Sequence, residues 1–195
     1  MKKILALLLS FLLVFGLLTA CTKDGGSEPA QPDETPAEQD GTEEGGVFDG
    51  RIGQEIETYF FNFTVNQAYL CEDYHGYTPQ DGKVLLVVDI DVENTTNSSI
   101  PMSDLDFQAQ WNDEADDAFS WPITSDPETG DDRGTVSEKQ LPYEYELAIG
   151  EKRNGELVYE VPEGEKDFSI STIDDFADET QEGDVYFVYF TAGYM

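Results

Sequence analysis

Residues 83–93 (KVLLVVDIDVE) constrain the fold of this chain more than any other stretch. Successive side chains of a strand point to opposite faces, so one face is wholly aliphatic: Val84, Leu86, Val88, Ile90 and Val92. On the other face, Leu85 and Val87 give way to acidic side chains. Burying the aliphatic face is worth on the order of 7–15 kcal/mol before conformational entropy opposes it. The stretch therefore predicts a central strand that begins buried on both faces and ends with one face in water.

A period of two residues recurs along most of the chain after residue 46. It predicts strands at 52–58, 59–70, 119–121, 143–147, 157–161, 168–172 and 185–190, with a further apolar face shared by Leu105, Phe107, Ala109 and Trp111. Within the second strand, the alternation places Tyr69 on the same face as Phe63 and Val65. Residues 122–140 have no periodicity, and 173–179 could form one helical turn. Many short strands separated by turn residues favour an all-β sandwich or barrel.

The first 21 residues have the pattern of an export signal that ends in a lipidation site. Lys2 and Lys3 form a basic start, and residues 4–18 are apolar apart from one serine and one glycine. An apolar core this short is typical of a signal peptide and not of a membrane span. The Leu-Thr-Ala-Cys sequence that follows resembles the bacterial lipobox, in which the cysteine is lipidated and the chain is cleaved just before it. On this resemblance Cys21 is the acylated first residue of the mature protein and anchors it in the membrane.

Two alternatives remain for this cysteine. The protein could be secreted with Cys21 as an ordinary thiol, or Cys21 could form a disulfide with Cys71, the second of the two cysteines in the chain. If Cys21 carries lipid, Cys71 has no partner and the exported fold has no disulfide. The mass of the mature N-terminus separates these cases.

Residues 22–46 cannot form a core, because they contain no aromatic residue and no aliphatic residue larger than alanine. They hold eight acids and one base, so the segment should extend beyond the roughly 25–30 Å that a flexible coil of this length spans. We therefore expect three parts: a lipoprotein signal peptide at 1–20, the lipidated Cys21 with a disordered acidic linker at 21–46, and a β-sandwich domain at 47–195.

The net charge excludes several classes of partner. The chain has 42 acids and 10 bases, a formal charge of −32, and the part from Val47 onward carries −27 from 34 acids and seven bases. Nucleic acids and anionic lipid surfaces need basic patches, so neither is an expected partner. A hydrophobic content of 39% still suffices for a core, so the charge does not imply disorder of the whole chain.

Three stretches together resemble an uncharacterised domain family of Gram-positive bacterial lipoproteins. Residues 82–96 are similar to the family's strand that ends in an asparagine turn, and 100–107 are similar to the acidic and aromatic segment that follows. Residues 147–162 are similar to its Gly-Glu-Lys turn and the strand after it, although Ile149 stands where the family often has proline. The resemblance implies an immunoglobulin-like antiparallel β-sandwich, akin to a mycobacterial secreted antigen, over most of residues 50–190. The family has no established active site, so the resemblance implies no catalytic residue.

The residue content argues against an enzyme. His75 is the one histidine of the chain, so a histidine-dependent nucleophile or zinc site would have to use it. Cys71 lies four residues earlier, but a buried cysteine and an incidental loop histidine explain the pair more simply. The sequence has no phosphate-binding Gly-Lys-Ser/Thr loop and no dinucleotide fingerprint. We therefore expect no catalytic residue and no required cofactor.

Two acidic loops make Ca²⁺ the candidate ligand of an alternative function. One turn holds Asp113, Glu114, Asp116 and Asp117. The long loop holds Asp126, Glu128, Asp131 and Asp132. Hard cations prefer clustered oxygens, and extracellular calcium sites are often weak, with Kd about 10⁻⁴–10⁻³ M. Neither set has the spacing of an EF-hand, so the sequence defines no metal ligand.

Aromatic side chains give the remaining indication of function. Five tyrosines on expected strands form either the core and its rim or a face that binds protein or glycan: Tyr143, Tyr145, Tyr159, Tyr186 and Tyr189. We expect a non-enzymatic binding module that is lipid-anchored to the cell membrane, on the extracellular face of a Gram-positive bacterium. Its partner would be an envelope protein or glycan. The alternative is a lipoprotein that binds Ca²⁺ or a small solute through its acidic loops.

Overall fold

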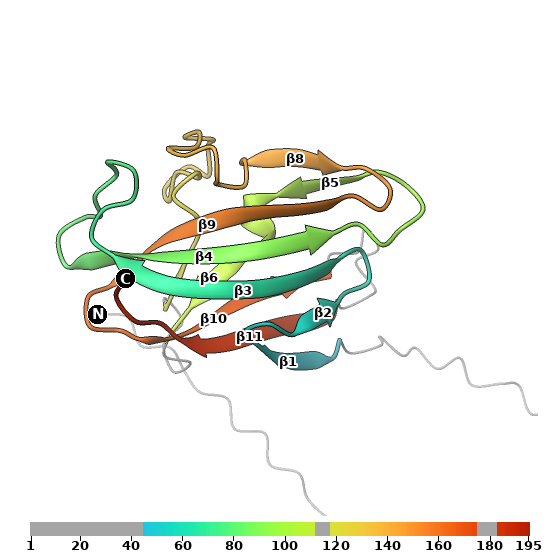
Figure 1. Cartoon of the computed structure of the whole chain (residues 1–195), viewed down its shortest axis with the longest axis horizontal. Helices are drawn as coiled ribbons and strands as arrows, with labels where there is room; N and C mark the ends of the chain where they lie inside the picture. The colour runs from blue at the N-terminus through green and yellow to red at the C-terminus, as the bar shows by residue number, and fades with distance from the viewer. Residues whose placement is uncertain (1–44, 112–117, 175–182) are drawn as a thin grey trace, which may run out of the picture. The chain divides into compact units, whose positions relative to one another are not determined.

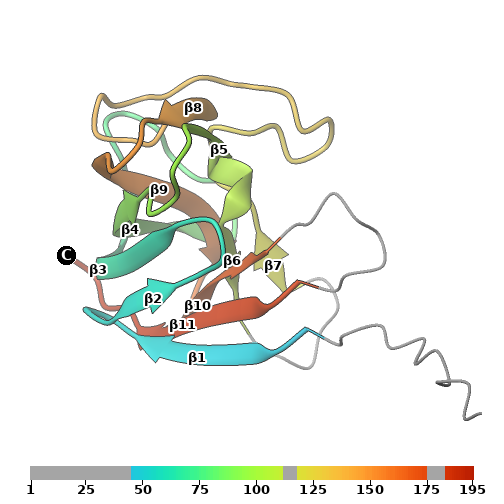
Figure 2. The same cartoon turned by 90° about the vertical axis from the view of Figure 1, so that its right-hand side faces the viewer.

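The computed structural model describes residues 45–111, 118–174 and 183–195, which fold into a sandwich of two β-sheets (Figure 1). The five-stranded sheet has the order β1-β11-β10-β6-β7, with bounds Val47–Arg51, Val185–Thr191, Asp167–Ile173, Gln108–Gln110 and Phe119–Ser120. The four-stranded sheet has the order β2-β3-β4-β9, with bounds Glu55–Glu57, Asn62–Cys71, Lys83–Glu93 and Lys152–Pro162. Strands β5 (Ile100–Ser103) and β8 (Glu144–Leu147) form a separate pair, and the 3₁₀-helix η1 (Asp104–Asp106) follows β5. The expected all-β sandwich is confirmed, and Figure 2 shows its two layers one above the other.

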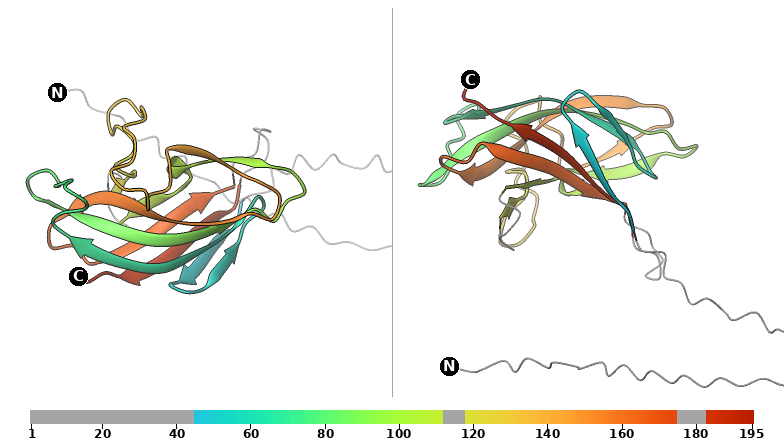
Figure 3. Two further views of the ribbon diagram at one scale, coloured as in Figure 1. Left: turned by 45° about the horizontal axis from the view of Figure 1, so that its top comes forward. Right: turned by 90° about the horizontal axis from the view of Figure 1, so that it is seen from below.

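Strand β4 lies at the centre of the core, as its pattern predicts. All the aliphatic side chains of its inner face are buried in the main apolar cluster, together with Phe63, Phe107 and Tyr159. β4 pairs with β3 on one side and with β9 along its whole length on the other. Figure 3 shows these three strands layered against β10 and β11. The alternation in the sequence thus determines which face of this sheet is buried.

The outer face of β4 is covered at the end where Leu85 and Val87 lie. Both side chains are fully buried and pack in a second apolar cluster with Tyr74, Ile123 and Val158. Tyr74 comes from the segment after β3, and Ile123 comes from the long loop before β8. These two connections therefore act as a partial third layer over the four-stranded sheet.

Two tyrosine hydroxyls fasten the segment after β3 to this face. Tyr74 and Tyr77 exchange backbone hydrogen bonds across a two-residue turn, and their hydroxyls donate to Glu156 and Glu160 of β9. Burial, together with the Glu160 carboxylate, raises the pKa of Tyr77 to about 12. The hydroxyl therefore stays protonated, and remains a donor, at neutral pH.

The expected alternation of β3 is wrong beyond Val65. The register shifts there, because Val65 and Gln67 pair with consecutive residues of β4. The extra residue forms a β-bulge, which moves the later side chains to the opposite face. Leu70 therefore enters the main core, whereas Tyr69 packs against the second apolar cluster.

Strand β1 departs from the antiparallel expectation. It pairs in parallel with β11, whereas the other pairs of named strands in the described residues are antiparallel. The chain then crosses to the other sheet, so a turn and the short β2 replace the expected single strand at 52–58. Gly53 permits this turn because its φ is +79°, a conformation that residues with a Cβ rarely adopt.

Helix η1 interrupts the strand that the sequence indicated around Phe107. Leu105 lies in η1, so it does not belong to the alternating pattern that Phe107 and Ala109 follow. A capping box closes the helix: the Ser103 hydroxyl accepts the Leu105 N–H, and the Asp106 carboxylate accepts the Ser103 N–H.

The structure tests only part of the helical turn that the sequence allowed at 173–179. Ile173 ends β10, and residues 175–179 lie outside the described ranges. Among the residues that the structure describes, no helix is long and apolar enough to cross a bilayer.

Candidate functional site

The five tyrosines indicated by the sequence do not form one binding face. Tyr159 and Tyr186 are buried, at 0% and 6% exposure. Tyr143, Tyr145 and Tyr189 are each half-buried. The structure therefore assigns these side chains to the core and its rim.

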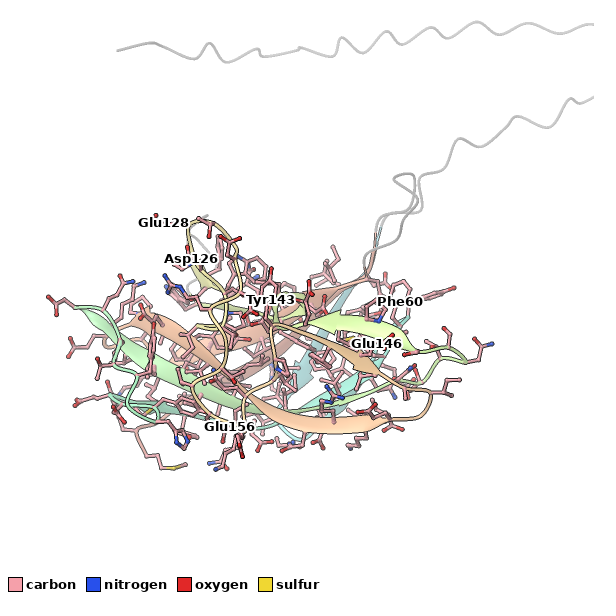
Figure 4. The ribbon with its side chains drawn as sticks, turned by 90° about the horizontal axis from the view of Figure 1, so that it is seen from above. Phe60, Asp126, Glu128, Tyr143, Glu146 and Glu156 are labelled. Atoms are coloured by element: carbon pink, nitrogen blue, oxygen red, sulfur yellow. The ribbon has the colours of Figure 1, made fainter. Side chains whose placement is uncertain are left out.

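The carboxylates of the long loop build the loop itself. Asp126 accepts hydrogen bonds from two backbone N–H groups and from the guanidinium of Arg133 at 2.6 Å. These bonds hold the pKa of Asp126 well below its usual value, at about 2. Asp131 and Asp132 also accept hydrogen bonds within the loop. Figure 4 shows Asp126 and Glu128 near the tip of this loop.

No cation site is formed by the described residues. They contain no group of three or more histidine, cysteine, aspartate or glutamate side chains that could hold a metal ion. The other acidic set lies outside the described ranges: Asp113, Glu114, Asp116 and Asp117. The long loop therefore provides no set of Ca²⁺ ligands for the alternative function, in which the protein binds Ca²⁺ through its acidic loops.

Cys71 and His75 lie in surroundings that do not favour nucleophilic chemistry. Cys71 is free and half-buried at the end of β3, and burial raises the pKa of its thiol. A raised pKa leaves little of the reactive thiolate. His75 occupies an exposed turn with φ +53°, and its ring packs edge-on against Tyr74, with 4.7 Å between ring centroids. Cys21 lies outside the described residues.

A groove of about 1010 Å³ opens beside the tip of the β2–β3 hairpin, and we call it the aromatic groove. Three segments line it: the hairpin tip at 59–61, the loop at 95–99 after β4, and β5 with η1 at 100–102 and Asp106. The tip contributes Tyr59, which is 69% exposed, and Phe60, which is half-buried. In Figure 4, Phe60 lies on the same side of the domain as Glu146 of β8, away from the tip of the long loop.

Thr58 and Asp174 hold the hairpin tip in one conformation. The Thr58 hydroxyl donates to the carbonyl oxygen of Phe61 at 2.7 Å and accepts two backbone N–H groups of the tip. The carboxylate of Asp174, only 3% exposed, accepts the backbone N–H of Tyr59 at 3.1 and 3.2 Å. Tyr186 donates to the same carboxylate at 2.9 Å, which ties the tip to β11. The rings of the tip are therefore presented by a fixed backbone.

Asn94, which is 1% exposed, fixes the opposite wall of the groove. Its side-chain nitrogen donates to the carbonyl oxygens of Ser98, Leu147 and Ala148, at 2.8, 3.0 and 3.2 Å. Its side-chain oxygen accepts the backbone N–H and the hydroxyl of Thr96. The asparagine turn that the sequence predicted after the central strand is therefore a wall of the candidate site.

Replacing Asn94 by alanine should destabilise the domain by about 2–4 kcal/mol, because several carbonyl groups lose their donor. Denaturant unfolding of the full chain measures this change. Asn97 is an exposed asparagine of the same loop, so Asn97→Ala is the matched control and should change the free energy of unfolding by less than about 0.5 kcal/mol. Equal losses in the two variants would contradict the role assigned to Asn94.

The groove combines aromatic rings with uncharged polar groups. Within the described part of the chain, the side chains of Thr95 and Asn97 and the hydroxyl of Ser98 make no hydrogen bond with the protein. No lysine, arginine or histidine is among the described residues that line the groove. Asp106, the one acid among these described lining residues, accepts the backbone N–H of Ser103 at 2.7 Å. The groove therefore suits a ligand that carries no negative charge and has both apolar surfaces and hydrogen-bonding edges.

A second cleft, of about 610 Å³, lies at the end of the five-stranded sheet. Its Tyr189 ring already has two neighbours: the guanidinium of Arg51, 5.3 Å from the ring centroid, and the ring of Phe187, with 5.7 Å between centroids. This cleft is smaller than the aromatic groove and has the charged Arg51 in its lining, so we take the aromatic groove as the candidate site.

Sequence reasoning missed the two rings of the hairpin tip. It treated 59–70 as one alternating strand and placed no site there. The run Tyr59-Phe60-Phe61 was an available signal, since alternation cannot bury three consecutive aromatic side chains on one face. The fold buries Phe61 at 7% exposure and leaves Tyr59 in solvent.

Comparison with one solved structure, YjhA, supports the fold. YjhA of Bacillus subtilis is 18% identical with a TM-score of 0.50, over 71% of this chain and 99% of that one. YcdA of Bacillus subtilis is 16% identical with a TM-score of 0.48, over 69% of this chain and 38% of that one, so the chain spans well under half of YcdA. An uncharacterized β-sandwich protein of Clostridium difficile 630 is 20% identical with a TM-score of 0.40, over 74% and 96% of the two chains.

No match was found among the curated proteins. A family model, described as a domain of unknown function (DUF4352), matches residues 50–185, which include most of both sheets and the whole of the aromatic groove. Since this match covers more than half of the sequence, the chain belongs to the DUF4352 family.

Proposed function

We propose that this protein is a non-enzymatic binding module, lipid-anchored through Cys21 on the extracellular face of a Gram-positive cell membrane, whose aromatic groove binds a component of the cell envelope. The observation that carries the proposal is the preorganisation of the groove. Buried Asp174 and Asn94 hold its two walls, while the Tyr59 ring stays exposed. A ligand then binds without the entropic cost of ordering these segments.

The groove lies near the residue at which the described domain begins. The Gly46 N–H donates to the Asp184 carboxylate at 2.6 Å, and the Asp184 carbonyl oxygen accepts the Asp174 N–H at 2.9 Å. Asp174 in turn holds Tyr59. These contacts connect the point where the chain enters the described domain with the hairpin tip. The groove therefore opens beside that entry point.

A pull-down from envelope extracts of the host cell tests the proposal. The mature full chain, immobilised in detergent, should retain an envelope component. Tyr59→Ala should lose most of it, because the largest exposed apolar surface of the groove is removed.

Tyr194 supplies the matched control, since it is a tyrosine with 56% exposure that does not line the groove. Tyr194→Ala should retain the component at the level of the unmodified chain. Retention that is equal in both variants, or no retention above blank resin, would refute binding in the groove.

A further inference from the structure

We infer that the ligand of the aromatic groove is a neutral saccharide chain, an inference that rests on the proposed function. The sequence indicated an envelope protein or a glycan as partner, but the structure does not form the tyrosine face that the sequence offered as the site for either. The residues that line the groove distinguish between classes of ligand by charge, by the chemistry of their surfaces and by size.

Charge excludes anionic ligands. The domain from Val47 onward carries a net charge of −27. The described lining of the groove includes no basic residue to offset that field. Anionic polymers and phosphate groups are bound through arginine, lysine or helix N-termini. A ligand of this groove therefore brings no negative charge.

The lining also matches the two surfaces of a pyranose ring. The C–H face of a sugar ring is apolar and packs on aromatic rings, whereas its edges carry hydroxyl groups that donate and accept hydrogen bonds. Tyr59 and Phe60, whose ring centroids lie 5.0 Å apart in an edge-to-face arrangement, offer the apolar side. Across the groove, Thr95, Asn97 and Ser98 offer hydroxyl and amide groups that can both donate and accept.

The size of the groove favours a chain over a single sugar. Pockets that enclose a drug-sized molecule have volumes of about 300–1,000 Å³. The groove, at about 1010 Å³, reaches the upper end of that range. A polymer threaded through the groove would place successive sugar units against the rings and against the polar loop.

The protein's own linker is the competing occupant, since residues 22–46 contain prolines that could dock on aromatic rings. That segment carries eight acids, and the domain is itself strongly acidic, so the two repel each other. A neutral saccharide meets no such repulsion.

The test is calorimetric titration of the mature full chain in a detergent without a sugar headgroup. The ligands are three neutral tetrasaccharides, of glucose, mannose and N-acetylglucosamine, with tetragalacturonate as the anionic comparison. At least one neutral tetrasaccharide should bind. Tetragalacturonate should show no heat of binding.

Variants then locate the site. Tyr59→Ala should weaken the binding at least about tenfold and Asn97→Ala severalfold, while Tyr59→Phe, which keeps the ring, should stay within about twofold of the unmodified chain. Tyr194→Ala should leave the affinity unchanged. Both Tyr59 and Asn97 are exposed, so neither truncation removes core packing.

The outcomes separate this inference from the proposed function. Absence of binding by all three neutral tetrasaccharides, or equal losses in Tyr59→Ala and Tyr194→Ala, would overturn the saccharide assignment. If the pull-down still retained a protein that depends on Tyr59, the groove would remain the site with a protein ligand. If a synthetic peptide of residues 22–46 bound the groove instead, the occupant would be the linker.

Discussion

Replacing Cys21 by serine is expected to release the protein from the membrane almost completely. The length and flanks of the apolar segment before Cys21 predict a signal peptide, and the resemblance to a lipobox predicts acylation of this sulfur. One acyl chain binds a bilayer only reversibly, but several together anchor a protein stably. The unmodified protein should therefore be found in the membrane fraction, and Cys21→Ser should appear outside it. Mass spectrometry should show a mature chain that begins at an acylated Cys21.

Cys71→Ser makes the same chemical change at the second cysteine and serves as the control. It should leave membrane attachment and the mature N-terminus unaltered, because Cys71 is a free, half-buried residue of β3. If both variants changed the migration of the non-reduced chain, a Cys21–Cys71 disulfide would replace the lipid anchor. If Cys21→Ser stayed in the membrane fraction at the level of the unmodified protein, the anchor would lie elsewhere.

The part of the fold that could be predicted is the part that depends on a local period. In β4, every second residue is aliphatic, and these side chains form one face of the strand. The fold buries that face and the first part of the opposite face. The same period located β10 and β11 to within one residue at each end, but it located only the second half of β9. Where the period breaks by a single residue, as at the bulge after Val65, the assignment of Tyr69 failed, because one inserted residue reverses every later side chain.

The site could not be read from the sequence, because its walls come from segments far apart in the chain. The Asp174 carboxylate accepts the backbone N–H of Tyr59, a residue 115 positions earlier in the chain. Asn94 fixes the other wall through carbonyl groups more than 50 residues later. A turn signal predicts that the chain reverses at Asn94, but no local pattern shows which segment lies opposite. The parallel pairing of β1 with β11 is non-local in the same way, since it joins the two ends of the domain.

Replacing Asp104 by asparagine at pH 8 should stabilise the domain by about 1–3 kcal/mol. Asp104 lies in η1 with 0% exposure, and the hydroxyls of Thr124 and Ser125 donate to its carboxylate. Burial is the largest influence on this group and raises its pKa to about 6, although the hydroxyl groups act in the opposite direction. The buried charge at pH 8 therefore destabilises the folded state, and asparagine removes it while keeping an oxygen that accepts the hydroxyl groups.

The sign of the pH dependence follows from the direction of this shift. The pKa of Asp104 is higher in the folded protein than its ordinary value of 3.8, so the folded state binds more protons between about pH 4 and pH 6. The contribution of this residue to stability should therefore increase as the pH falls from 6 towards 4. Above pH 6 its ionisation costs about 3 kcal/mol at most. The difference in stability between Asp104→Asn and the unmodified chain should accordingly be largest at pH 8 and nearly absent at pH 4.

Net charge has to be separated from burial, because any substitution that removes a negative charge relieves repulsion in a chain of charge −32. Asp81→Asn removes the same charge at an exposed turn and measures that relief. Denaturant unfolding of the three full chains at pH 4, 6 and 8 should show a small gain for Asp81→Asn and a larger gain, which grows more steeply with pH, for Asp104→Asn. Equal gains at pH 8 would mean that overall repulsion, and not the burial of Asp104 beneath the long loop, sets the effect. A loss of stability in Asp104→Asn at every pH would mean that the carboxylate is needed to hold Thr124 and Ser125 against η1.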